Sequence, residues 1–128
     1  MSFFKNIFGN SDESEEQSKM NWSRLTSISQ LDDIISLSNE KPIVIFKHST
    51  RCIISRMALK QFEKEFDLLD KITPYFLDLL EHRDISNEIA QRFGVMHQSP
   101  QLLLIENGAS SYNASHENIS AITLKNKI

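Results

Sequence analysis

The sequence predicts an α/β fold with three layers, in which a mixed sheet of four to five strands carries helices on both faces. Two short apolar runs, 42–46 and 74–78, have the composition of strands that are buried on both faces. Each is followed by a segment with apolar residues at helical spacing. The dipeptide Asn107-Gly108 adds a hairpin signal near the carboxyl terminus.

The size and charge of the chain limit the classes of protein that it can be. Its 128 residues include 40% hydrophobic and 24% charged side chains, which is close to the average for globular proteins. The formal net charge of −3 comes with no basic cluster, so we expect no nucleic-acid partner. No apolar run approaches the roughly 20 residues that span a bilayer, so we expect no transmembrane segment.

The chain divides into two parts by composition. Residues 10–19 are acidic and contain no apolar side chain, which is typical of a solvated linker. We therefore expect a flexible N-terminal extension with an acidic linker over 1–19 and a folded domain over 20–128. Residues 1–9 lack the features of an export signal. This absence predicts a cytoplasmic protein, in a compartment where thiols are kept reduced.

The first half of the domain contains a predicted edge strand, a helix and the central strand. Residues 22–25 can form a short edge strand. Ser29 and Asp32 have the spacing of a capping box and predict the start of a helix. The continuous apolar run 42–46 then predicts the central strand of the sheet.

Two more helices are predicted in the middle of the chain. The segment 53–66 has apolar residues at helical spacing, and the pattern turns Met57 and Phe62 inward. The next helix follows the strand 74–78 and opens at Asp84 or Ser86. It closes at residue 93, because a glycine at position 94 is a common helix terminator.

The last third predicts a hairpin and a helix. The strand 101–105 is joined through Asn107-Gly108 to an antiparallel partner over 109–113. Ser115 then caps a final helix over 116–126, whose apolar side includes Ile122 and Leu124. The predicted order, (β)αβαβαββα, is the thioredoxin arrangement.

The single cysteine, Cys52, lies between the end of the central strand and the start of a helix. Helix amino termini present free N–H groups and a partial positive charge, and both stabilise a thiolate over a thiol. The neighbouring Arg51 adds a cation. The alternative interpretation is a small buried core residue, since free cysteines are often buried. The polar neighbours of Cys52 favour the reactive interpretation.

Two further positions bear on the chemistry of Cys52. Ser55 stands three residues later, where a dithiol enzyme has its second cysteine, and its hydroxyl can donate a hydrogen bond to the sulfur. The alternative is an ordinary first-turn serine. Ser99 and Pro100 immediately precede a buried strand. The histidines have no metal-like spacing, so we expect no metal site.

The segment Phe46-Lys-His-Ser-Thr-Arg-Cys52-Ile-Ile-Ser55-Arg-Met-Ala58 resembles the monothiol bacilliredoxins, redox proteins of the bacillithiol system of the YtxJ/BrxC type. The segments 94–101 and 115–119 also match, and the likeness runs from about Trp22 to the end of the chain. Two features depart from the pattern: Ile53 stands where such motifs often have proline, and the acidic extension is outside the resemblance.

The resemblance implies a thioredoxin-like fold, with Cys52 as the nucleophile and a cis peptide bond before Pro100. Thioredoxins place a buried acid six residues before the nucleophile, where it helps to deprotonate the second cysteine. Phe46 occupies that position here. The absence of the acid agrees with the absence of a second thiol.

The resulting hypothesis is that a monothiol thiol-disulfide oxidoreductase removes bacillithiol from protein mixed disulfides and contributes to redox homeostasis. The expected catalytic residues are Cys52 and Ser55. The expected substrate-binding residues are Thr50, Arg51, Ser99 and Pro100, and Lys47 or His97 is a further candidate for binding the malate carboxylates of bacillithiol. We expect no bound cofactor, bacillithiol as the thiol co-substrate, and S-bacillithiolated proteins as partners.

The sequence also allows two other functions. A thioredoxin-fold binding or redox-sensing module would use Cys52 without catalysis. An iron–sulfur carrier is disfavoured, because monothiol glutaredoxins that hold a cluster have Gly-Phe between cysteine and serine, whereas this chain has Ile53 and Ile54.

Overall fold

A computed structural model describes residues 20–128 of the protein. The predicted N-terminal extension and acidic linker, residues 1–19, lie outside the described residues. The elements, in chain order, are β1 (Ser23–Arg24), α1 (Ser29–Leu37), β2 (Ile43–His48), α2 (Ile53–Glu65), β3 (Thr73–Asp78), α3 (Arg83–Phe93), β4 (Gln101–Glu106), β5 (Ala109–Ser115), the short 3-10 helix η2 (His116–Asn118) and α4 (Ala121–Lys125).

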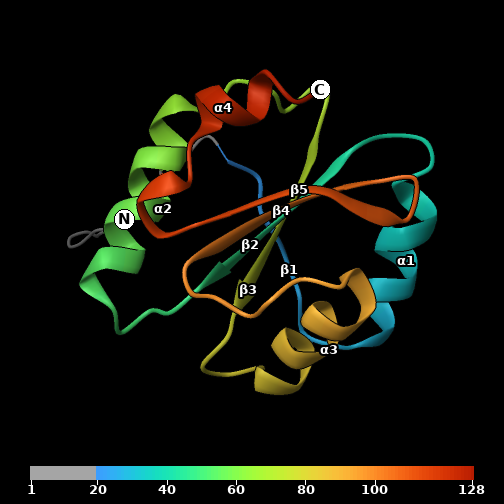
Figure 1. The fold of residues 1–128 in the computed structure, drawn as a ribbon, viewed down its shortest axis with the longest axis horizontal. Helices are drawn as coiled ribbons and strands as arrows, with labels where there is room; N and C mark the ends of the chain where they lie inside the picture. The colour runs from blue at the N-terminus through green and yellow to red at the C-terminus, as the bar shows by residue number, and fades with distance from the viewer. Residues whose placement is uncertain (1–19) are drawn as a thin grey trace, which may run out of the picture.

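The five strands form one mixed sheet in the order β1-β3-β2-β4-β5, with β2 at its centre (Figure 1). Strand β3 runs parallel to both β1 and β2. Strand β4 is antiparallel to β2 and forms a hairpin with β5. The predicted α/β class and the central position of the strand before Cys52 are confirmed.

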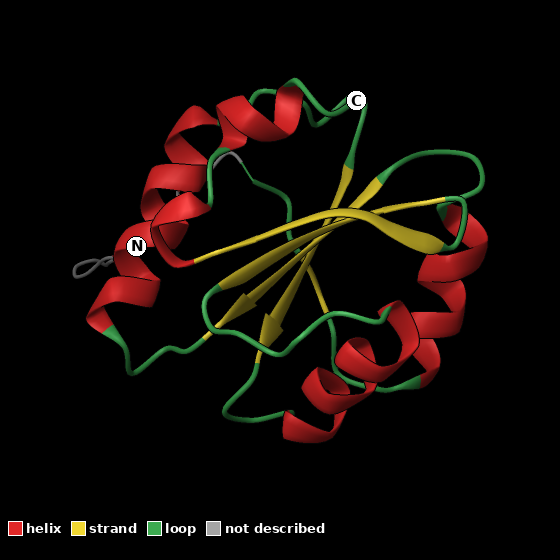
Figure 2. Ribbon diagram, in the orientation of Figure 1, coloured by secondary structure: helices red, strands yellow, loops and turns green. Residues whose placement is uncertain are grey.

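Helices cover both faces of the sheet, as predicted (Figure 2). Helices α1 and α3 pack on one face and α2 and α4 on the other. Alternate residues of β2 explain this arrangement, since Val44 and Phe46 contribute to the core under α2 and α4, while Ile43 and Ile45 contribute to the opposite core. All six residues of β2 are buried. The central strand therefore provides a rigid base for the loop that follows it.

Three residues in the left-handed region match the sequence pattern. Asn107 and Gly108 have φ angles of 52° and 79°, as the predicted tight hairpin requires. Gly94 has a φ of 63° and ends α3, where the N–H of Val95 donates to the carbonyl of Ala90. The hairpin and the end of α3 are thus confirmed.

The start of α1 differs from the predicted capping box. Ser29 is already helical and its hydroxyl pairs with Ser27 rather than with the backbone. Instead, Oε1 of Gln30 accepts the N–H groups of Thr26 and Ser27, at 2.6 and 2.9 Å. The side chain of Gln30 thus stabilises the turn that precedes α1, and the helix itself begins after Ile28 without a side-chain cap.

The carboxyl-terminal helix is shorter than predicted and has a different cap. Residues 116–118 form the 3-10 helix η2, and the chain is extended again at Ser120 before α4 begins. The hydroxyl of Ser120, not that of Ser115, accepts the capping N–H, which comes from Thr123. His116 has a φ of 55°, which prevents a continuous helix from position 116 onward.

Two apolar side chains predicted to face the core are exposed instead. Met57 precedes Phe62 by five positions, which is about 140° around a helix with about 100° per residue. Ile122 and Leu124 are likewise separated by about 200°. Phe62 and Leu124 occupy the core, and Met57 and Ile122 are consequently 66% and 59% exposed.

Candidate functional site

Cys52 occupies the N-cap position of α2, one loop after the end of β2. Its backbone is extended, with φ −98° and ψ 122°, and the residue is half-buried. The N–H of Cys52 donates to the carbonyl of Ser49 at 3.1 Å, which closes the turn that leads into the helix. The predicted position at a helix amino terminus is confirmed, and the free N–H groups of the first turn lie next to the thiol.

Ser55 lies in the first turn of α2 and is completely buried. Its Oγ accepts the N–H of Ser49 at 3.1 Å and lies 2.8 Å from Nδ1 of His48. The hydroxyl thus connects the first turn of α2 with the end of β2 and with the first residue of the loop that carries Cys52. A hydrogen bond from Ser55 to the sulfur stays a prediction.

His48 is a site residue that the sequence patterns did not identify. It is the last residue of β2 and only 3% exposed. Burial lowers the pKa of His48, although the carboxylate of Asp78 opposes the shift. A neutral imidazole can accept the hydroxyl proton of Ser55 at Nδ1. The detectable signal was the continuation of an apolar strand into two polar residues, Lys47 and His48.

An aromatic cluster lies under the cysteine loop, where a dithiol thioredoxin has its buried acid. Phe46 is fully buried, with ring centroids 5.6 Å from Phe62, 6.0 Å from Trp22 and 6.5 Å from His48. Strand β2 contains no acidic residue. The cysteine loop therefore has no buried carboxylate on β2 that could act as a base.

The Ser99-Pro100 peptide bond is cis, as the family resemblance implied. Strand β4 pairs with β2 so that Gln101 is opposite Lys47. Ser99 and Pro100 therefore lie at the same edge of the sheet as the loop that carries Cys52. Pro100 is buried and Ser99 is half-buried.

Lys47 anchors the loop that precedes Pro100. Its side chain is fully buried, and its ammonium donates to Nδ1 of His97 at 3.0 Å. The hydroxyl of Ser86 on α3 lies 3.1 Å from the same nitrogen. Burial lowers the pKa of Lys47 to about 8. The expectation that Lys47 binds a carboxylate of the ligand is wrong, because its charge does not reach the surface.

His97 is exposed as a whole, yet its Nδ1 faces inward to Lys47. A lysine ammonium has no acceptor, so Nδ1 of His97 must be unprotonated in this bond. Burial and the nearby charges of Lys47 and Arg83 lower the pKa of His97, in agreement with a neutral ring. His97 therefore positions the loop, and its binding of a ligand stays a prediction.

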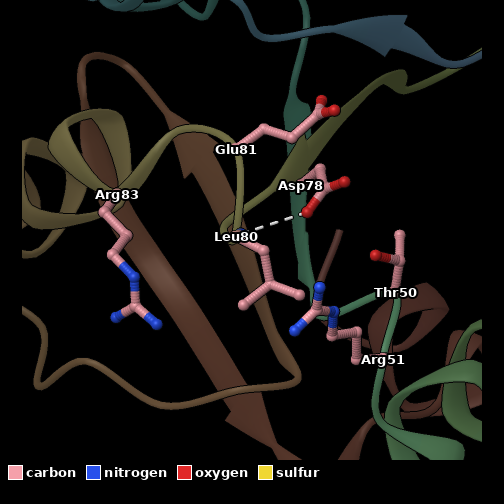
Figure 3. Close-up of a pocket in the computed structure, with 6 residues that line it drawn as sticks. All are labelled: Thr50, Arg51, Asp78, Leu80, Glu81 and Arg83. Atoms are coloured by element: carbon pink, nitrogen blue, oxygen red, sulfur yellow. Dashed lines mark hydrogen bonds between the residues drawn. The ribbon is translucent and has the colours of Figure 1, made fainter.

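Thr50 and Arg51 are exposed and line a cavity of about 410 Å³ beside the cysteine loop (Figure 3). The other side of this pocket comes from Asp78 at the end of β3, from Leu80 and Glu81 in the loop after it, and from the first residue of α3. Ligand pockets commonly have volumes of 300–1,000 Å³. The two predicted binding residues thus share a hollow of suitable size.

The first turns of α2 carry exposed apolar side chains. Ile53, Ile54 and Met57 are 64%, 64% and 66% exposed, and Ile53 follows Cys52 directly. Met96, in the loop before Pro100, is 79% exposed. Exposed apolar groups of this size next to a cysteine are suited to contact with another protein.

The comparisons with known proteins agree with this geometry. The family model of the monothiol bacilliredoxin BrxC matches residues 23–124. A solved structure described as a thioredoxin-fold oxidoreductase is 34% identical, with a TM-score of 0.71, and the match covers 81% of this chain and 90% of that chain.

Two thioredoxins show the same fold at lower identity. Mitochondrial thioredoxin 3 from Saccharomyces cerevisiae is 18% identical with a TM-score of 0.63, over 84% of this chain and 92% of its own. Thioredoxin from Malassezia sympodialis is 21% identical with a TM-score of 0.64, over 88% and 92%. Within residues 20–128, no helix is both long and apolar enough to cross a membrane.

Proposed function

The chain belongs to the monothiol bacilliredoxin family, and on this premise we propose that it removes bacillithiol from mixed disulfides on other proteins through Cys52. The observation that carries the proposal is the placement of the only cysteine of the chain at the start of α2, half-buried and beside the cis-proline edge. A thiol in this position can attack an incoming disulfide but has no second cysteine with which to form an internal one.

The reaction consists of two thiol–disulfide exchanges. The Cys52 thiolate attacks the bacillithiol sulfur, so that a bond between Cys52 and bacillithiol forms while the protein–bacillithiol disulfide breaks. The protein leaves as a thiolate and takes a proton from water. A second bacillithiol thiolate then attacks the bacillithiol sulfur on Cys52. This step releases oxidised bacillithiol disulfide and restores the Cys52 thiolate.

The residues around Cys52 have separate roles in this proposal. Ser55 is a positioning residue, because its hydroxyl joins Ser49 and His48 and so sets the loop in front of α2. Ser99 and Pro100 supply backbone next to the attacked disulfide. Thr50 and Arg51 contact the bacillithiol portion from the neighbouring pocket.

The protein portion of the substrate contacts the exposed apolar side chains on α2. Ile53, Ile54 and Met57 offer an uncharged surface that tolerates many sequences, which suits an enzyme that repairs different bacillithiolated proteins. We place this activity in the cytoplasm, where a reducing thiol pool can regenerate Cys52.

The test is release of bacillithiol from a bacillithiolated model protein, followed by intact mass spectrometry of both proteins. We expect the wild type to free the model protein and to gain the mass of one bacillithiol on Cys52. The variant Cys52→Ser should lose all release, because a hydroxyl cannot form the disulfide intermediate.

Binding without turnover would contradict the proposal. If the wild type bound the bacillithiolated protein without releasing it, and Cys52→Ala bound it equally well, the chain would be a binding module. Unfolding of Cys52→Ser by urea provides the control for folding. Its midpoint should stay near that of the wild type, since the substitution keeps the size of a half-buried side chain.

A further inference from the structure

Two arginines from different segments of the chain, Arg51 and Arg83, line the pocket beside the cysteine loop. Of the two, only Arg51 was predicted from the sequence as a site residue. Arg51 belongs to the loop after β2, and Arg83 is the first residue of α3, after β3. The parallel register pairs His48 with Asp78, so both loops leave the sheet at the same edge. This register brings Arg83 next to the cysteine loop although it is 31 positions away from Cys52 in the chain.

Both guanidinium groups are exposed, and neither forms an ion pair with any of the residues that the structure describes. By contrast, Arg92 on the same helix α3 binds Asp32 at 2.6 Å and Glu88 at 2.7 Å. Figure 3 shows Arg51 and Arg83 reaching into the pocket from opposite walls, with Leu80 between them. Two unpaired cations directed into one hollow favour an anionic ligand, because guanidinium groups bind carboxylates through paired hydrogen bonds.

The same pocket also carries two carboxylates, those of Asp78 and Glu81. In Figure 3 the carboxylate of Glu81 points away from both guanidinium groups, and that of Asp78 lies between Glu81 and Arg51. The backbone N–H of Leu80 holds Oδ1 of Asp78 at 3.1 Å, which fixes this carboxylate in place. The pocket therefore carries charges of both signs and complements a ligand that has both carboxylates and an amine.

We propose that this pocket is the specificity site for the low-molecular-weight thiol, in which Arg51 and Arg83 bind two carboxylates while Asp78 and Glu81 face an amine. This inference rests on the proposed function. Bacillithiol has this chemistry, with two malate carboxylates and a cysteine amine, and glutathione shares the same three charged groups. A thiol without carboxylates, such as cysteamine, cannot use the two arginines.

The pocket also determines which sulfur of the mixed disulfide is attacked. Cys52 follows Arg51 directly in the chain, and Arg51 lines the pocket. In this proposal a small thiol bound in the pocket therefore presents its sulfur to the nucleophile. The outcome of an exchange depends on which of the two sulfurs is attacked. Binding of the small thiol in the pocket directs the attack to its sulfur and makes the protein thiol the leaving group.

The experiment compares release of three thiols from the same model protein: bacillithiol, glutathione and cysteamine. For Arg83→Ala and for Arg51→Ala we expect the KM for the bacillithiol adduct to rise about 3- to 10-fold, as for one lost carboxylate contact at an exposed site. The rate with the cysteamine adduct should not change for Arg83→Ala, because cysteamine has no carboxylate. Arg51→Ala also removes a cation next to Cys52, so its effect is measured as the ratio of bacillithiol to cysteamine release. Arg83→Lys should restore part of the preference, since it keeps the charge without the paired hydrogen bonds.

Arg56→Ala is the matched control, because it removes an arginine of α2 that does not line this pocket. It should leave the ratio of bacillithiol to cysteamine release unchanged. The inference is overturned if Arg56→Ala lowers this ratio as much as Arg83→Ala does, or if neither pocket arginine changes it.

The outcomes separate this inference from the proposed function. If the wild type releases bacillithiol but neither arginine substitution changes the thiol preference, the proposed function is supported and the specificity site is refuted. If the wild type releases glutathione but not bacillithiol, and the arginine substitutions reduce this release, the dicarboxylate site is supported and bacillithiol is refuted as the thiol. A wild type that releases none of the three thiols refutes the proposed function and with it the specificity site.

Discussion

Two loops meet at the carboxyl end of β2, and different chemistry holds each of them. The loop with Cys52 is held by neutral groups, since Ser55 connects the buried imidazole of His48 with the N–H of Ser49. The loop before Pro100 is held by a buried ammonium, since Lys47 donates to His97. Adjacent residues of one strand, Lys47 and His48, thus point to opposite faces and anchor one loop each.

Because one loop is anchored by an imidazole and the other by an ammonium, the two anchors should affect stability in different pH ranges. Burial lowers the pKa of His48, so the unfolded chain takes up a proton more readily than the folded one, and stability falls as pH drops below about 6.5. Burial lowers the pKa of Lys47 from 10.5 to about 8, so the folded protein loses a proton before the unfolded chain does. Stability then rises with pH between those two values.

The largest effect should come from Lys47→Met, which keeps the length of the side chain and removes its charge. We expect the free energy of unfolding at pH 7 to increase by about 1–3 kcal/mol, because burial of an unneutralised ammonium is unfavourable. The gain in stability over the wild type should shrink as pH rises from about 8, the pKa of Lys47 in the folded protein, to 10.5, its ordinary value. Urea unfolding of both proteins at pH 7 and pH 10 measures this gain.

Lys60→Met is the control for this comparison, since it removes an exposed lysine from α2. It should change the free energy of unfolding by no more than about 0.5 kcal/mol. An equal gain for Lys47→Met at both pH values would show that the charge of Lys47 carries no cost in the folded state.

An effect of comparable size and opposite sign should follow from Ser55→Ala in the other loop. It leaves Nδ1 of His48 and the N–H of Ser49 without their partner, so we expect a loss of about 1–3 kcal/mol in the free energy of unfolding. Release of bacillithiol should slow about 2- to 13-fold, the equivalent of one neutral hydrogen bond. Complete loss of release by a folded Ser55→Ala protein would give Ser55 a direct catalytic role instead.

The smallest effect should come from Ser86→Ala, the buried serine beside His97. Nδ1 of His97 keeps the hydrogen bond from Lys47, so we expect a loss of only about 0.5–1.5 kcal/mol. The urea midpoints of Ser55→Ala and Ser86→Ala, measured side by side, test the comparison of the loops. A Ser86→Ala protein that is less stable than Ser55→Ala would reverse it.

Local patterns predicted the elements that border the site. The apolar run before Cys52 became the central strand β2, and the segment after it became α2, so the cysteine lies at their junction. Asn107 and Gly108 turned the last hairpin as predicted. The predicted caps of α1 and α4 were wrong, because Ile28 precedes α1 without a side-chain cap and Ser120 rather than Ser115 caps α4. Only the path of the chain decides which residue takes the N-cap position.

The pairs of residues that build the site could not be predicted in this way. The partnership of Lys47 with His97 depends on the register between β2 and β4, and the meeting of Arg51 with Arg83 depends on the register between β2 and β3. Strand register follows from packing of the whole sheet rather than from any short segment. His48 shows the same limit, since only burial against the aromatic cluster makes its imidazole a structural partner of Ser55.

The sequence by itself therefore determined the α/β class, the order of strands and helices, and the position of the single cysteine at a helix start, because these depend on residues close together in the chain. The tertiary structure alone decided which polar side chains became buried anchors and which remained free at the surface. Lys47 lost contact with water while Arg51, only four residues later, kept it. The physical reason is that burial and pairing depend on what packs against a residue from distant parts of the chain.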